Sequence, residues 1–525
     1  MRFARQQLLH FRLRFSVILF AISATVLPLQ GQDDSAVIPH RYLVVYRNGA
    51  IPGDAETRTL AAGAQLLQRN DRFGIATVKA IQSNSSALPR ALSEQLGDDG
   101  AIIRTLAAQP NVDFVLHDRL VTASHLQIRP IAAEPTFSVT VAQPYDLYYN
   151  SPQGWAVRQV GGYGAGTPGG PARGPWDVTT GKGVRIAILD SGVDQNHPDI
   201  APNLALNLTE VNKNDLPSPC DDGSPQDQEG HGTWTASLAA AAMGSGTGQA
   251  IGVAPSASLL NIKVLERMPA NISGNTSASS QCAAGEASGL LSWVIQGIQD
   301  AMDNHADVVS ISLGATIDLS TGDGAGLKAA FDRIAYAAFQ SGLVLIAAAG
   351  NDAYDLSNPR YVELPAQARG VLAVVASTNP SCAENTALYA TCAPGPPTLA
   401  YYSNYGSPLN ALAAPGGSYP IGDGDFAPSG WIRGACSSGL SKTVDGMPSD
   451  PQHSFGCFNL GHIPYVQAIG TSASAPLAAG VAALLRAIHP DWDAATVISR
   501  MRVSADTIST LPVPQIDAAA ALAQP

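Results

Sequence analysis

Three side chains that could together perform nucleophilic catalysis lie far apart in the sequence. Asp190 ends an apolar run and is followed at once by Ser-Gly. His231 stands between two glycines at the start of an alanine-rich stretch, and Ser472 precedes a second apolar run in the segment Gly-Thr-Ser-Ala-Ser-Ala-Pro. Taken singly, each has an ordinary structural explanation: a turn-forming aspartate, a histidine at the start of a helix and an N-cap serine.

Taken together, the three side chains have complementary chemistry. A serine hydroxyl needs a base to become a useful nucleophile, histidine can act as that base near neutral pH, and a buried carboxylate orients the imidazole. A serine at a helix N-terminus also lies beside backbone N–H groups that stabilise a developing oxyanion. Asn351, in Ala-Ala-Gly-Asn after another apolar run, could donate its side-chain amide to the same oxyanion.

The elements that must position these residues follow an alternating pattern. Strand-length apolar runs alternate with helical stretches, the runs being 184–189, 259–265, 308–313, 343–348 and 371–376 and the helices 232–243, 289–304 and 327–341. This pattern predicts an α/β fold, a parallel sheet with helices on both faces. Sites in such sheets form at the carboxyl ends of the strands, where Asp190 and Asn351 are expected.

A smaller unit precedes the α/β array. Residues 37–122 contain strands expected at 41–46, 75–79 and 111–122, with helices expected over 60–69 and 88–96, so we predict a small α+β domain. Residues 123–144 lack periodicity and are interpreted as a linker, and the large unit is expected to occupy 145–525.

The N-terminus indicates a secreted protein. Residues 1–31 combine several arginines with an apolar run that ends at Pro28, shorter than the about 20 residues that span a membrane. This is typical of a secretory signal peptide, whose removal would leave no membrane attachment. An uncleaved membrane anchor stays open, because the cleavage region lacks Ala-x-Ala. We expect an extracellular protein, with the periplasm as the alternative.

The composition limits the classes of molecule that the chain is expected to bind. The net charge of −12 disfavours binding to a nucleic-acid backbone, and 45% hydrophobic residues exclude a disordered chain. We expect a monomer.

The six cysteines are an even number in a chain expected to be secreted, so we expect disulfides. The absence of Cys-x-x-Cys pairs argues against a zinc or redox motif. Sequence cannot choose among the many pairings. Our interpretation is that Cys382–Cys392 and Cys436–Cys457 close local loops and that Cys220–Cys282 takes what remains.

Several motifs occur in an order that resembles one family. The sequence from about residue 145 to the end is similar to the subtilisin-type serine proteases in Asp190-Ser-Gly-Val, His231-Gly-Thr, Ser310-Ile-Ser-Leu-Gly314, Ala348-Ala-Gly-Asn351 and Gly470-Thr-Ser-x-Ser-Ala-Pro476. Residues 37–122 resemble the inhibitory propeptide of that family.

The resemblance implies a secreted serine endopeptidase that acts on proteins or peptides without a catalytic cofactor. Ser472 would be the nucleophile, His231 the general base and then acid, Asp190 its orienting carboxylate, and Asn351 an oxyanion donor. Residues 37–122 would be an intramolecular inhibitor, removed by cleavage in cis or in trans within the linker 123–144.

The resemblance also implies positions for substrate and metal. Ser312, Leu313 and Gly314 would form an edge that pairs with extended substrate, and Ala349 and Gly350 the opposite wall. Small residues there suggest a pocket for a large apolar side chain. Structural calcium is suggested by Asp221, Asp222 and Asp227, for which a solvated acidic loop is the alternative. The long cysteine-containing insertions are interpreted as stapled surface loops bordering the cleft.

Two other functions remain compatible with these residues. An esterase or amidase could use the same three side chains, although no Gly-x-Ser-x-Gly segment surrounds Ser472. A binding protein that keeps the scaffold without activity is the third hypothesis, and labelling of an activated serine would distinguish it.

Overall fold

The structure is a computed structural model of the 525-residue chain. It describes residues 37–81, 99–123, 127–130, 154–161, 174–243, 250–270, 277–378, 396–407, 409–418, 430–439, 456–458 and 460–523. The expected signal peptide, the helix expected over 88–96, most of the linker and the pair Cys382–Cys392 lie outside these ranges.

The centre of the molecule is a seven-stranded sheet in which every neighbouring pair is parallel. Its order is β16 (Ala411–Pro415), β15 (Leu372–Ser377), β13 (Val344–Ala348), β11 (Val308–Ile311), β6 (Arg185–Asp190), β8 (Ser258–Lys263) and β7 (Leu204–Thr209). The predicted α/β fold with a parallel sheet is confirmed.

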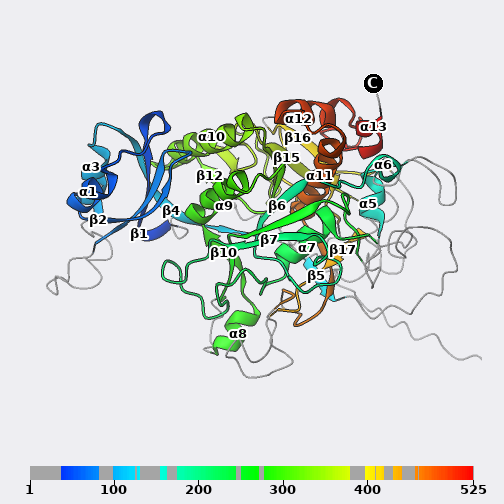
Figure 1. Ribbon diagram of the computed structural model, residues 1–525, viewed down its shortest axis with the longest axis horizontal. Coiled ribbons are helices and arrows are strands. Elements are labelled where there is room, and N and C mark those ends of the chain that lie inside the picture. The colour runs from blue at the N-terminus through cyan, green and yellow to red at the C-terminus, as the bar shows by residue number, and fades with distance from the viewer. Residues whose placement is uncertain are drawn as a thin grey trace, which may run out of the picture.

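Helices cover both faces of this sheet (Figure 1). Alternate strand residues such as Ile186 and Ile346 pack in one cluster with α7 (His231–Ala240) and α11 (Thr471–Ile488). Their chain neighbours Ala187 and Ala347 pack in a second cluster with α9 (Leu291–Asp303) and α10 (Gly324–Gln340). Burial on both faces is why these strands read as continuous apolar runs.

Shorter elements complete this unit. They are α5 (Trp155–Gln159), α6 (Pro175–Val178), α8 (Ala278–Ala283), α12 (Ala494–Val503), α13 (Ala518–Leu522), the antiparallel pair β12 (Ala315–Asp318) and β14 (Tyr361–Leu364), and the three-stranded sheet β17 (Ile432–Ala435), β18 (Tyr465–Ile469) and β5 (Gln127–Pro130). Helix α11 is apolar and long enough to cross a membrane, but 89% of it is buried inside the protein, as expected of a core helix.

The N-terminal unit forms an antiparallel sheet that is distinct from the seven-stranded sheet. Its order is β2 (Ala64–Asn70), β3 (Ile75–Ala80), β1 (Val37–Tyr46) and β4 (Val112–Thr122), continued by β10 (Glu286–Leu290) and β9 (Glu266–Met268) of the large unit. A single turn, η2 (Arg47–Gly49), follows β1, and the helices are α1 (Ala55–Ala61) and α3 (Asp99–Ala107). One face of the sheet packs on these helices and the other joins the cluster of α9 and α10.

The helix expected over 60–69 is wrong. Helix α1 ends at Ala61, and the chain then forms β2, which pairs antiparallel with β3. Pairing with a neighbouring strand overrides a helical period that is too short to hold a helix by itself.

Candidate active site

Asp190 and His231 meet in the interior at the carboxyl end of β6. Both side chains are completely buried, and Nδ1 of His231 donates to Oδ1 of Asp190 at 2.7 Å. The carboxylate is held by two further donors, the backbone N–H of Ser191 at 2.7 Å and the hydroxyl of Thr235 at 3.1 Å. This geometry fixes the imidazole tautomer and leaves Nε2 as the atom that can take a proton.

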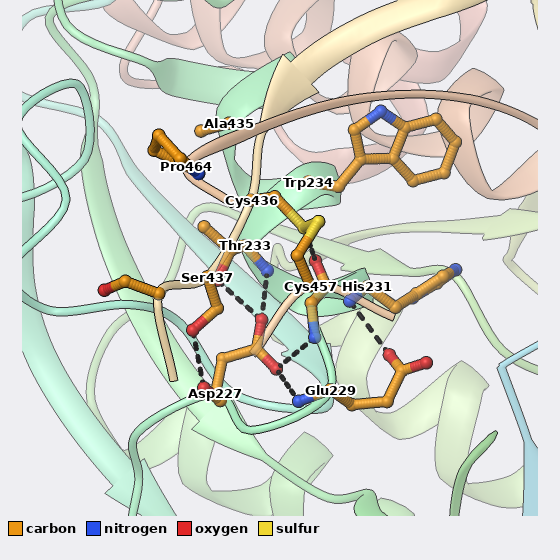
Figure 2. The surroundings of a disulfide bond; sticks show 12 residues. Asp227, Glu229, His231, Thr233, Trp234, Ala435, Cys436, Ser437, Cys457 and Pro464 are labelled. Atoms are coloured by element: carbon orange, nitrogen blue, oxygen red, sulfur yellow. Dashed lines mark hydrogen bonds between the residues drawn. A yellow bond between two sulfur atoms is a disulfide. The ribbon is translucent and has the colours of Figure 1, made fainter. Parts of the chain in front are cut away.

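The start of α7 positions His231. Gly230 has φ +113°, and a Cβ there would lie 2.8 Å from Sγ of Cys436, so only glycine fits. The carboxylate of Asp227 accepts the backbone N–H groups of Glu229, Gly230 and Thr233 and so caps the first turn (Figure 2). Glu229 accepts the N–H of His231 itself at 2.9 Å.

These buried carboxylates change the proton affinity of the histidine. Burial, the largest single cause, lowers the pKa of His231, but the charge and hydrogen bond of Asp190, together with the charges of Glu229 and Asp227, raise the pKa overall. An imidazolium formed at this position is therefore stabilised.

Ser472 is the second residue of α11, whose first residue, Thr471, follows Gly470. Its side chain is buried, its Oγ donates to the carbonyl of Ser312 at 3.3 Å, and Oγ of Ser312 donates to the carbonyl of Ser472 at 2.9 Å. A Cβ on Gly480 would lie 3.1 Å from the carbonyl of Ala239, so α11 and α7 pack closely. Ser312 follows β11 and Asp190 ends β6. Because these two strands are adjacent and parallel, Ser472 and His231, which contact these residues, lie at the same carboxyl edge of the sheet.

Asn351 contacts the start of the same helix. Its Oδ1 accepts from the backbone N–H and from the hydroxyl of Thr471, each at 2.8 Å. The amide oxygen accepts both of these hydrogen bonds, so the NH2 group is the part of the Asn351 side chain that can donate one. The four residues predicted to carry chemistry thus come from β6, α7, α11 and the end of β13.

The predicted substrate edge is occupied by β4. Thr122 forms an antiparallel bridge with Gly314 on one side and pairs with Ser288 of β10 on the other, and the N–H of Ala123 donates to the carbonyl of Ala287 at 3.1 Å. An apolar pocket beside Val121 is lined by residues that include Leu291, Val294, Leu313, Ile317 and Phe331.

The sequence analysis did not predict β10, the strand that pairs with Thr122 on its other side, because its only signal is the short segment Ala-Ser-Gly. Ala349 and Gly350, the expected opposite wall, form backbone hydrogen bonds with other segments. The N–H of Ala349 donates to the carbonyl of Val374, and the carbonyl of Gly350 accepts from the N–H of Asn404.

The aspartates predicted as calcium ligands do not form a common site. Asp221 makes a buried ion pair with Lys263 at 2.8 Å, Asp222 accepts the N–H of Ser224, and Asp227 caps α7. Burial, followed by the charge of Glu229, raises the pKa of Asp227 to about 7. Within the described ranges no group of three His, Cys, Asp or Glu residues is placed to hold a metal ion.

Two of the three expected disulfides are present, Cys220–Cys282 and Cys436–Cys457. All four cysteines are buried, and the interpretation of their insertions as stapled surface loops bordering the cleft stays a prediction. Figure 2 shows the second disulfide against the segment that leads into His231. Buried backbone groups must find hydrogen-bond partners. The groups next to this disulfide donate to the carbonyls of residues 227–229.

Known proteins resemble this chain in sequence and in fold. The model of the subtilase family matches residues 181–518. Thermitase of Thermoactinomyces vulgaris is 36% identical over 176 residues, 34% of this chain and 50% of that protein. Subtilisin NAT of Bacillus subtilis subsp. natto is 30% identical over 326 residues, 62% of this chain and 61% of that protein. The chain thus spans about half to three fifths of these relatives.

A solved structure shows the same fold. Fervidolysin from Fervidobacterium pennivorans, described as a keratinolytic enzyme related to subtilisin, superposes with a TM-score of 0.60 at 18% identity. The match covers 94% of this chain and 62% of that one.

Proposed function

The chain belongs to the subtilase family, and from this premise we propose that it is a secreted serine endopeptidase made as a self-inhibited precursor. The observation that carries the proposal is the buried Asp190–His231 hydrogen bond at the edge where α11 presents Ser472. Residues 1–31 would direct secretion, as their signal-peptide pattern predicts.

In the proposed reaction Ser472 attacks the peptide carbonyl. His231 accepts the proton of the hydroxyl, becomes an imidazolium stabilised by Asp190, and returns that proton to the leaving amine. The Asn351 amide and the backbone N–H at Ser472 would hold the oxyanion at the N-terminus of α11. Water then releases the acyl group by the same steps in reverse.

The contacts of residues 37–122 support an inhibitory role. The Asp118 carboxylate accepts the backbone N–H of Ser292 at 3.1 Å and its hydroxyl at 2.7 Å, so it caps α9, and it also accepts Nε of Arg41 at 2.6 Å. His117 contacts Asp323, the residue before α10, at 2.6 Å. With these anchors the end of β4 lies between β10 and Gly314, where it would exclude substrate.

The pairing of Ala123 and of Gln127 with other strands narrows the proposed maturation site. Gln127 of β5 pairs with Ile469 of β18, which runs into α11, while Ala123 pairs at the substrate edge. We expect cleavage between Ala123 and Gln127, in cis or in trans.

The test is Ser472→Ala in the full chain, with Ser499→Ala on the exposed face of α12 as the matched control. We expect the first variant to remain uncleaved, to leave casein intact and to resist a fluorophosphonate probe, whereas the control matures normally. A processed and proteolytic Ser472→Ala protein would overturn the proposal. Turnover of short-chain esters without casein would favour the esterase hypothesis.

A further inference from the structure

A buried glutamate lies beneath the two glycines that border the proposed substrate pocket. Glu363 belongs to β14 and pairs with Thr316 of β12, the strand that directly follows Gly314. Its side chain is 3% exposed. The antiparallel pair β12 and β14 thus places a carboxyl group next to Gly314.

The close approach of Gly314 and Gly350 shows where this carboxyl group lies. A Cβ on Gly314 would lie 2.5 Å from Oε1 of Glu363, and a Cβ on Gly350 would lie 3.2 Å from its Cδ. No other residue at position 314 would leave room for the carboxylate. Glu363 therefore lies between the edge residue Gly314 and the opposite-wall residue Gly350.

The carboxyl group has little to compensate a negative charge. Oε2 accepts the hydroxyl of Thr316 at 2.6 Å, and among the described residues no lysine, arginine or histidine forms an ion pair with Glu363. Burial, and the like charge of Asp352, raise the pKa of Glu363 to about 8. Ionisation of a carboxyl group buried without a counterion is costly, so a bound cation would stabilise the ionised form of Glu363.

We propose that Glu363 is a specificity-determining residue that selects lysine or arginine as the substrate residue before the scissile bond, the P1 residue. The inference rests on the proposed endopeptidase function and replaces the expectation of a pocket for large apolar side chains. A bound ammonium or guanidinium supplies the missing counterion and N–H donors for Oε1. An apolar P1 side chain would instead leave the carboxyl group unpaired.

Maturation does not have to obey this preference. Residues 124–126, between Ala123 and Gln127, are Ser-His-Leu and include no lysine or arginine. A cleavage within one chain starts from a very high effective concentration and tolerates a poor P1 residue.

The test compares mature wild type with Glu363→Gln on peptide nitroanilides that differ only at P1, carrying Arg, Lys, Leu or Ala. Glutamine keeps the size and the acceptor for Thr316 but removes the charge. We expect the ratio of kcat/KM for Arg over Leu to fall about 100-fold, while kcat/KM for Leu changes less than about 3-fold. Asp491→Asn, an exposed carboxylate beyond α11, is the control and should leave the ratio unchanged.

A second measurement needs no variant. In wild type the Arg over Leu ratio should rise as the pH passes through about 8, because Glu363 loses its proton there and Asp352 is the charged group that bears on it. A wild type that prefers Leu at every pH, or a Glu363→Gln variant with an unchanged ratio, would overturn this inference and leave the proposed endopeptidase standing. A wild type that cleaves none of the peptides and resists the fluorophosphonate probe would overturn both.

Discussion

Removal of the Cys436–Cys457 disulfide should reduce catalysis as well as stability. The change is Cys436→Ala with Cys457→Ala, which deletes the bond and adds no buried polar group. The two cysteines are 21 residues apart, and closing a loop of that length stabilises the folded state by about 3 kcal/mol in the chain-entropy model. We expect the variant to lose stability of that order.

The effect on catalysis follows from the hydrogen bonds that residues next to the two cysteines make. Three consecutive carbonyls before His231 accept hydrogen bonds from them: Ser437 Oγ donates to Asp227 at 2.6 Å, Gly456 N to Gln228 at 3.0 Å, and Phe458 N to Glu229. The ring of Phe458 also lies edge-on to the His231 imidazole, with centroids 6.3 Å apart. Loosening these contacts misplaces the base, so we expect kcat to fall about 10- to 100-fold.

The assay combines thermal unfolding with kcat and KM for one peptide, on protein purified without reductant. KM should change little, because the proposed substrate edges, β10 and Ser312 to Gly314, lie on other elements. The comparison variant is Cys220→Ala with Cys282→Ala, whose loop of 62 residues predicts a larger stability loss of about 4 kcal/mol. If the Cys436 and Cys457 variant unfolds earlier but keeps its kcat, the reasoning that its disulfide positions His231 is refuted.

Two further predictions concern the proposed catalytic groups. Asn351→Ala should lower kcat by about 100- to 1000-fold, the loss of one oxyanion donor, with little change in KM; a decrease below about 3-fold would remove Asn351 from the oxyanion site. The pH profile of kcat/KM should rise with a midpoint above about 6.5, because the pKa of His231 is raised and only the neutral imidazole accepts a proton. Asp190→Asn should move that midpoint to lower pH, and an unchanged midpoint would contradict the role given to Asp190.

Local sequence was sufficient to predict the scaffold and to single out candidate catalytic residues, whose roles stay predictions. The apolar runs predicted the central strands because a strand buried on both faces is apolar throughout, and Asp190 and Asn351 were found because they follow such runs. The motifs around His231 and Ser472 are short, so backbone geometry and side-chain chemistry are encoded within a few residues of each. The same locality explains the error at β2, where the deciding partner was another strand.

Tertiary structure decided the groups that depend on residues distant in the chain. The aspartates at 221, 222 and 227 read as one acidic loop, but Asp221 pairs with a lysine from β8 and Asp227 with the N-terminus of α7. Glu363 carries no local signal in Tyr-Val-Glu-Leu-Pro, and it lies next to Gly314 only because β14 pairs with β12. Hydrogen-bond partners and burial, which set the charge and the role of a side chain, are properties of the packed chain and not of its neighbours in sequence.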